Sequence, residues 1–81
     1  MKIEVKLFAA AREKLGADAI EVQLSATATV ADLRAALRDQ VPQLQSVLAT
    51  AQFAVDQQYV PDDFELHPQM EVACIPPVSG G

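Results

Sequence analysis

Two short runs near the start of the chain alternate apolar and polar residues. Residues 2–8 place Ile3, Val5 and Leu7 on one side, and residues 19–24 do the same with Ile20, Val22 and Leu24. A period of two is typical of a half-buried strand. Between them, residues 9–15 are rich in helix formers, and Gly16 follows where a helix end favours a left-handed residue. We predict two antiparallel strands joined by a short helix.

The middle of the chain changes to helical spacing. Thr29 suits an N-cap, and the apolar residues after it recur every three or four positions: Val30, Leu33, Leu37 and Val41. Pro42 cannot continue a helix, so the main helix is predicted over about residues 30–40. Residues 43–50 are expected to hold a further short turn or helix.

The remainder predicts three more strands. Residues 53–55 and 59–60 form two short apolar runs around a polar turn at 56–58, and Pro61 closes the second run. Residues 66–69 predict a turn before a last strand over 70–75. This order indicates an α+β fold in which one main helix packs on a mixed sheet, and it fits the β-grasp. Residues 1–75 are expected to form that domain, and residues 76–81 a tail.

Composition narrows the classes of function. With 81 residues, 51% of them hydrophobic, the chain suits one folded domain rather than a disordered segment. A net charge of -5 disfavours a nucleic-acid partner, since binding to phosphates requires clustered basic residues. No run approaches the roughly 20 apolar residues that span a bilayer, so we expect no membrane partner and a cytoplasmic location. Cys74 and His67 are single residues of their kinds, so no metal site is expected.

The last six residues carry the candidate chemistry. Pro76 and Pro77 fix φ and disfavour further ladder pairing, so the segment should leave the sheet as an extended arm. Val78 and Ser79 follow, and then Gly80-Gly81, which lack Cβ atoms and would let the terminal carboxylate pass through a narrow channel. A carboxylate is a poor acyl donor, so the Gly81 carboxylate would need activation, most simply adenylation by ATP on a partner enzyme.

Three segments resemble a known family. Residues 8–16 (FAAAREKLG), 71–73 (EVA) and 76–81 (PPVSGG) are similar to the small subunit of molybdopterin synthase. The resemblance implies that the Gly81 carboxylate is adenylated by an E1-like enzyme and converted to a thiocarboxylate. It also implies that the tail, Pro76, Pro77, Val78, Ser79 and Gly80, enters partner active sites.

The same resemblance implies the partners. The large subunit of molybdopterin synthase would form a heterotetramer of two small and two large subunits with this chain. The thiocarboxylate would supply sulfur to cyclic pyranopterin monophosphate in molybdenum-cofactor biosynthesis. An E1-like adenylyltransferase would use the ATP, and a sulfur donor enzyme would provide the sulfur. The chain would be a non-catalytic sulfur-donor subunit with no bound cofactor.

Other residues have two interpretations. Phe8 and Ile75 lie near the ends of strands expected to be neighbours, and they suit either a partner interface or core packing. Arg12 suits either an ion pair within the domain or a partner contact. Cys74 and His67 lack neighbours that would make them reactive, so we expect no catalytic role for them. The acids Asp62, Asp63 and Glu65 are expected to form a solvated loop, with steering of a basic partner as the alternative.

Two other functions fit the same sequence. One is a sulfur carrier for thiamine or another pathway, or a ubiquitin-like protein modifier. The other is a non-catalytic ubiquitin-like module that binds through its sheet, for which Gly80 and Gly81 would be irrelevant.

Overall fold

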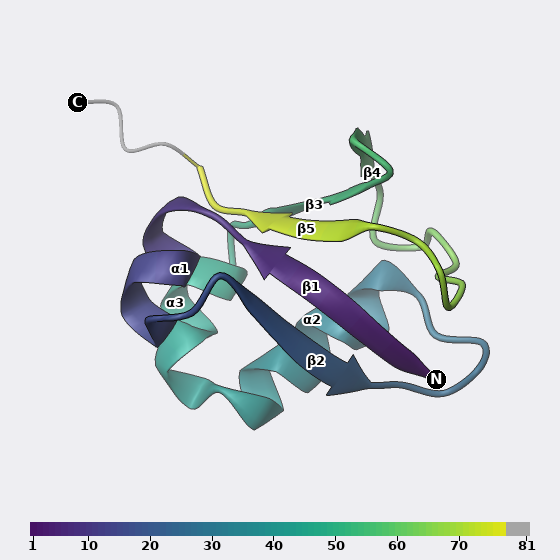
Figure 1. Cartoon of the computed structure of the whole chain (residues 1–81), viewed down its shortest axis with the longest axis horizontal. Helices are drawn as coiled ribbons and strands as arrows, with labels where there is room; N and C mark the ends of the chain where they lie inside the picture. The colour runs from purple at the N-terminus through teal and green to yellow at the C-terminus, as the bar shows by residue number, and fades with distance from the viewer. Residues whose placement is uncertain (78–81) are drawn as a thin grey trace.

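A five-stranded mixed sheet organises residues 1–77, the part of the chain that the computed structural model describes. In chain order, the strands are β1 (Lys2–Leu7), β2 (Ala19–Gln23), β3 (Gln52–Val55), β4 (Gln58–Val60) and β5 (Val72–Ile75). Their spatial order is β2-β1-β5-β3-β4, with β1 and β5 parallel and the other neighbours antiparallel. The N-terminal strand and the last strand therefore lie side by side in the middle of the sheet (Figure 1).

The helices gather on one side of this sheet (Figure 1). They are α1 (Ala9–Leu15), α2 (Val30–Gln40), the 3-10 helix η1 (Pro42–Leu44) and α3 (Gln45–Leu48). None of the helices among the described residues is long and apolar enough to cross a bilayer.

Local chemistry accounts for the ends of the two longer helices. Thr29 and Asp32 form a capping box, in which the Asp32 amide donates to Thr29 Oγ1 and the Thr29 amide donates to Asp32 Oδ2. α1 ends at Gly16, whose φ of 73° lies in the left-handed region and whose amide donates to the Arg12 carbonyl at 2.8 Å. α2 does not continue through Pro42, because proline lacks the amide proton that a longer helix would need.

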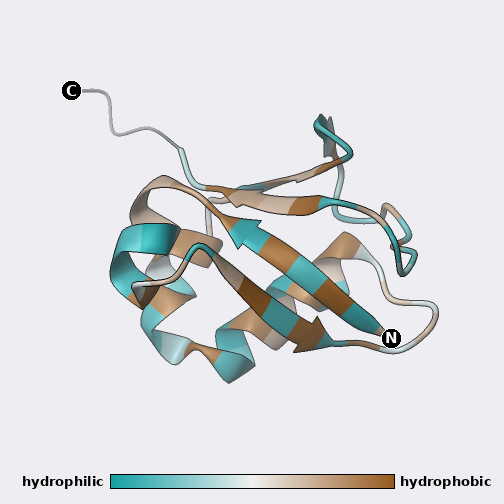
Figure 2. Ribbon diagram, viewed as in Figure 1, coloured by the Kyte–Doolittle hydropathy of each residue, from teal (hydrophilic) through white to brown (hydrophobic). Residues whose placement is uncertain are grey.

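The core lies between the sheet and the helices. Along β1, burial alternates residue by residue, and Figure 2 shows the matching alternation of hydropathy on β1 and β2. One apolar cluster combines the inner faces of the strands with the apolar stripe of α2 and with η1 and α3. Its largest fully buried side chains include Phe53, Ile3, Leu7, Leu33, Leu37, Leu44, Leu48 and Leu66.

The opposite face of the sheet carries the other residues of each strand. Lys6 pairs with Ala73, Ala73 pairs with Ala54, and Ala54 pairs with Tyr59 across the sheet. These four residues form one row on the face that the described helices leave open, because directly paired residues point to the same face. This row is the base on which the candidate site is built.

The predicted α+β architecture is confirmed, and the arrangement is that of the β-grasp. The main helix was predicted with its observed bounds, and the further short turn or helix expected at 43–50 is observed as η1 and α3, which together span residues 42–48. The last strand begins at Val72 rather than residue 70, because the Met70 amide still donates to the His67 carbonyl in the preceding turn. β4 begins at Gln58, one residue earlier than predicted, since the turn before it needs only Asp56 and Gln57.

That turn between β3 and β4 holds two non-glycine residues in the left-handed region. Asp56 has a φ of 49° and Gln57 a φ of 70°. Two-residue hairpin turns with both φ values positive match the right-handed twist of their strands and favour Asn or Asp followed by Gly. Asp56 fits this preference, whereas the Cβ of Gln57 makes its conformation costly.

We expect Gln57→Gly to raise the free energy of unfolding by about 1 kcal/mol, because glycine adopts the left-handed region without steric cost. Urea unfolding followed by circular dichroism measures the change. Gln52→Gly is the matched control: Gln52 is also an exposed glutamine, but it lies in a strand, where glycine costs about 0.5–1 kcal/mol. Destabilisation by both substitutions would contradict the assignment of strain to Gln57.

Candidate functional site

An apolar hollow lies on the open face of the sheet. It has a volume of about 320 Å³ and is lined by Phe8, Ala54, Gln57, Tyr59, Glu71, Ala73 and Ile75. The two paired alanines leave room at its base, and the larger side chains stand around them. Phe8 is 43% exposed and Tyr59 is 65% exposed, and these are the large hydrophobic residues exposed among residues 1–77. An apolar hollow with exposed aromatic walls is typical of a protein-binding surface.

Phe8 is held at the junction of β1 and α1. Its amide donates to the Cys74 carbonyl at 3.3 Å, which extends the contact between β1 and β5 by one residue. Its carbonyl accepts from the amides of Ala11 and Arg12, which begin the helix. The next residue, Ala9, has a φ of 49° and reverses the chain. The backbone of Phe8 is therefore fixed while its side chain stays accessible.

Arg12 lies in a second hollow, on the other side of Phe8. This hollow has a volume of about 360 Å³ and is lined by Glu4, Lys6, Leu7, Phe8, Arg12, Asp18 and Ala19. The guanidinium of Arg12 lies 3.9 Å from an oxygen of Asp18, and both side chains are largely exposed. An exposed ion pair of this length contributes little to stability, about 0–1 kcal/mol, so it leaves Arg12 available to a partner.

β5 leads from the apolar hollow directly into the tail. Ile75 lines the hollow, Pro76 is buried and Pro77 is exposed. The packed part of the chain thus includes the first residue of the predicted tail. The predicted tail residues Val78, Ser79 and Gly80, and the predicted reactive residue Gly81, lie outside the described residues.

Cys74 belongs to the core rather than to a site. Its side chain is fully buried on the inner face of β5, paired with Phe53 of β3. Burial raises the pKa of the Cys74 thiol from 9.0 to about 11, although the Arg34 guanidinium acts in the opposite direction. A buried thiol with a raised pKa is a poor nucleophile, as the sequence predicted.

We expect native Cys74 to resist iodoacetamide at pH 8 and to react once urea unfolds the chain. Because the pKa is raised in the folded state, folding favours the neutral thiol. Its contribution to the free energy of unfolding is complete below pH 9 and is lost as the pH rises through about 11. The difference between the wild type and Cys74→Ala across this range isolates the thiol. A pH-independent difference would contradict this assignment.

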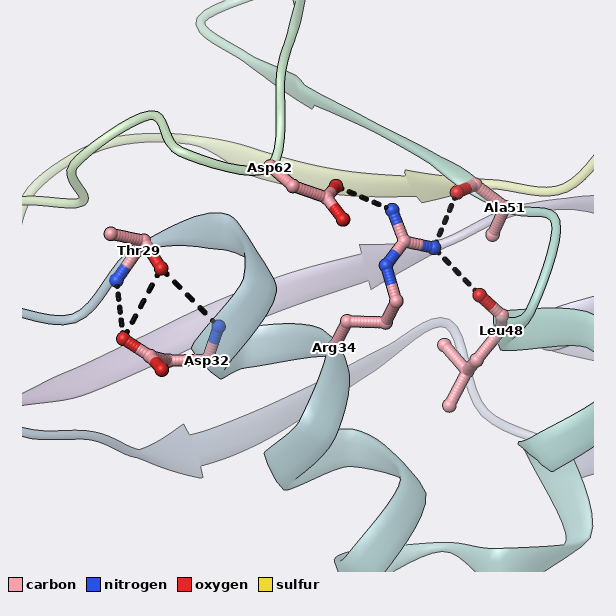
Figure 3. A network of polar contacts seen from close by, with 6 residues as sticks. All are labelled: Thr29, Asp32, Arg34, Leu48, Ala51 and Asp62. Carbon is pink, nitrogen blue, oxygen red and sulfur yellow. Dashed lines mark hydrogen bonds and ion pairs between the residues drawn. The ribbon is translucent and has the colours of Figure 1, made fainter.

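A polar network on the helix side gives Asp62 a structural partner (Figure 3). The guanidinium of Arg34 on α2 donates to the carbonyls of Leu48 and Ala51, at 2.6 and 2.7 Å, and to Asp62 Oδ1 at 2.8 Å. It also lies 5.0 Å from the ring centroid of Phe53. Asp62 was predicted to be part of a solvated loop, and Asp62, Asp63 and Glu65 are indeed exposed. Asp62 is in addition an ion-pair partner of a mostly buried arginine, which the sequence did not predict.

The structure brings together some of the predicted site residues. Phe8 and Ile75 share the apolar hollow, and Phe8 and Arg12 share the second one. Sequence reasoning missed Tyr59 and Arg34. The pairing of Ala54 with Tyr59 could have identified Tyr59 on the open face. No local signal could have identified the role of Arg34, because its partners lie 14 to 28 residues away in the sequence. Within residues 1–77, no cluster of three or more His, Cys, Asp or Glu residues could hold a metal ion.

Comparison with known proteins identifies one family and close relatives. The ThiS family matches residues 5–81. The molybdopterin synthase sulfur carrier subunit of Chlamydomonas reinhardtii is 43% identical over 83 residues, which cover 100% of both chains. The sulfur carrier subunit of the same name from Dictyostelium discoideum is 35% identical, covering 99% of this chain and 96% of that one.

The fold is similar to that of a solved structure over its full length. The crystal structure of SAMP1 from Haloferax volcanii superposes with a TM-score of 0.87 at 29% identity, and the match covers 100% of both chains. The sheet and its helices are therefore shared along the whole length of that protein.

Proposed function

The chain belongs to the ThiS family of ubiquitin-like sulfur carriers, and from that membership we propose that it is the sulfur carrier subunit of a molybdopterin synthase. The observation that carries this proposal is the 43% identity to such a subunit across the full length of both chains. The apolar hollow beside the strand that leads to the tail supports it, since a carrier must dock on other proteins while it offers them its end.

The reacting group in this proposal is the carboxylate of Gly81. A carboxylate oxygen attacks the α-phosphorus of ATP and pyrophosphate leaves, which gives an acyl-adenylate. A persulfide on the sulfur donor enzyme then attacks the acyl carbon and displaces AMP, which gives an acyl disulfide. A thiol attacks the donor's sulfur in this disulfide, so that the thiocarboxylate leaves and a disulfide forms between the donor and the thiol. Attack on the pyranopterin substrate transfers that sulfur, and hydrolysis returns the carboxylate. The chain supplies the acyl group and its delivery, whereas the catalytic side chains belong to its partners.

The partners follow from this cycle. An E1-like adenylyltransferase binds the ATP, a sulfur donor enzyme supplies the sulfur, and the synthase large subunit receives the charged tail, with cyclic pyranopterin monophosphate as the acceptor. The name of the relatives, a subunit of molybdopterin synthase, supports the large subunit as a partner. We propose an assembly of two carriers and two large subunits, and a cycle that runs in the cytoplasm, where ATP is available for the activation step.

Docking uses the open face of the sheet. Phe8, Tyr59 and Ile75 surround the apolar hollow and offer it to an apolar side chain of the partner. Arg12 lies beside Phe8 with a weak ion pair that a partner carboxylate can replace. Because β5 is followed directly by Pro76 and Pro77, docking here would bring these two residues to the partner.

We expect Phe8→Ala to weaken binding to the large subunit by roughly tenfold to a hundredfold, since burial of an aromatic ring contributes about 1.5–3 kcal/mol. Isothermal titration calorimetry measures the affinity. Arg38→Ala is the control, because Arg38 is exposed on α2, on the opposite side of the sheet. If Phe8→Ala and the wild type bound with equal affinity, Phe8 would not be part of the interface.

The proposed function is tested by incubating the protein with an E1-like activator, ATP and a sulfur donor. The intact mass should change by one exchange of oxygen for sulfur, and the product should support molybdopterin formation with the large subunit. An unchanged mass with an activator that works on a known relative would refute the carrier function. A thiocarboxylate that serves only thiamine synthesis, or a conjugate with other proteins, would reassign the pathway.

A further inference from the structure

The outer wall of the apolar hollow is carried by a weakly held strand. β4 has three residues, and among residues 1–77 it lies at the edge of the sheet and pairs only with β3. Tyr59, in the middle of β4, and Gln57, in the turn before it, both line the hollow. A short edge strand has ladder bonds on one side only, so the position of this wall depends on the hairpin that supports it.

Asp56 fastens that hairpin to the start of β5. The register between β3 and β5 pairs Val55 with Val72, so the next antiparallel pair is Asp56 and Glu71. The Asp56 amide donates to the Glu71 carbonyl at 2.8 Å, as a ladder residue would. The return bond differs: the Glu71 amide donates to Asp56 Oδ1, at 3.1 Å. The side chain of Asp56 therefore takes the place of a backbone carbonyl in the ladder.

The backbone of Asp56 explains this substitution. Its φ of 49° begins the turn, so the chain leaves the strand geometry at the residue that would otherwise complete the pair. The position needs two properties together: tolerance of the left-handed region, and a short side chain with an acceptor oxygen. Asp and Asn combine both, glycine provides only the first, and alanine provides neither.

The same contact reaches the rest of the hollow. Glu71 lines it, and the Glu71 carboxylate lies 3.7 Å from Lys6 Nζ on β1. Glu71 thus connects the hairpin turn to β1 beside the apolar hollow: its amide contacts Asp56 and its carboxylate contacts Lys6.

Resting on the docking role proposed above, we propose that Asp56 is a positioning residue for partner binding. Its carboxylate replaces its own carbonyl in the β3–β5 ladder and so holds β4, with Tyr59, as the wall against which an apolar side chain of the synthase large subunit packs. Asp56 acts through Tyr59 and does not itself need to touch the partner.

Four variants at this position and its target test the proposal: Asp56→Asn, Asp56→Gly, Asp56→Ala and Tyr59→Ala. Affinity for the large subunit is measured by calorimetry at a temperature where circular dichroism shows each variant folded. Asp56→Asn keeps the acceptor and should bind within about twofold of the wild type. Asp56→Gly keeps the turn but loses the acceptor, and it should bind about tenfold more weakly, as should Asp56→Ala. Asp56→Gly binding as well as the wild type would overturn the proposal.

A double-mutant cycle separates positioning from general destabilisation. If Asp56 acts by holding Tyr59, then Asp56→Ala should cost less than about twofold in affinity once Tyr59→Ala has removed the wall. An equal tenfold cost in both backgrounds would overturn the positioning role. Failure of the wild type to bind the large subunit would refute the proposed function itself, which is a different result from unaltered binding by Asp56→Gly.

Discussion

Deletion of Gly81 is expected to abolish sulfur transfer while the domain remains folded. The shortened chain ends at Gly80, so its carboxylate lies one residue, about 3.5 Å, short of the reacting centre that the native tail reaches. Misplacement of reacting atoms by about 1 Å can cost a hundredfold in rate, so we expect a loss of at least about a hundredfold. The folded state should be unaffected, because the deletion leaves in place every residue of the apolar core described for residues 1–77.

Two measurements follow the deletion: the intact mass after activation, and molybdopterin formation with the large subunit. Addition of one residue after Gly81 should have the same effect, because the native carboxylate becomes part of a peptide bond. The matched control is one residue added before Met1. β1 and β5 are parallel, so β1 begins at the end of the sheet opposite to that where β5 enters the tail. Transfer within twofold of the wild type after deletion of Gly81 would exclude the terminal carboxylate as the sulfur-carrying group.

Arg34→Ala is expected to cause the largest loss of stability, about 3 kcal/mol. The guanidinium makes three hydrogen bonds, and its side chain is only 17% exposed. Truncation leaves two backbone carbonyls without this donor, and hydrogen bonds to charged groups contribute about 1.5–3 kcal/mol each where they are desolvated. The contact with the Phe53 ring is also lost. For a domain of this size, such a change lowers the melting temperature by about 12–24 °C.

Thermal and urea unfolding measure the effect. Arg38→Ala, on the same helix but exposed, should change stability by less than about 0.5 kcal/mol. Arg34→Lys should be intermediate, since a single ammonium group cannot match the fork with which the guanidinium reaches α3 and Asp62. A loss below 0.5 kcal/mol for Arg34→Ala would show that water replaces the network without cost.

The proposed chemistry of the tail depends on residues that are adjacent in the sequence, so it can be suggested from the sequence alone. Pro76-Pro77 and Gly80-Gly81 have consequences for backbone geometry that need no other part of the fold. Asp62 shows the opposite case. In sequence it is one of a group of acids, and only the position of α2 reveals that it pairs with Arg34.

The candidate site was predicted only in part, because its residues come from separate strands. Phe8 and Ile75 were recognised as residues near the ends of neighbouring strands, and they share one hollow. Tyr59 was missed because its place depends on β4 being the edge strand beyond β3. The hydrogen bond from the Glu71 amide to Asp56 Oδ1 was missed because the two residues lie 15 apart in the sequence.

The sequence by itself determined the helices and strands. Alternation in β1 and β2, the capping box at Thr29 and the stop at Pro42 are local properties, since neighbouring residues impose them through sterics and hydrogen bonds. Tertiary structure decided which surfaces these elements form. The parallel contact between β1 and β5 joins residues about 67 apart, so it brings Phe8 beside Ile75, while the reach of Arg34 unites α2, α3 and the loop after β4. Such contacts depend on how the whole core packs, and no short stretch of sequence specifies them.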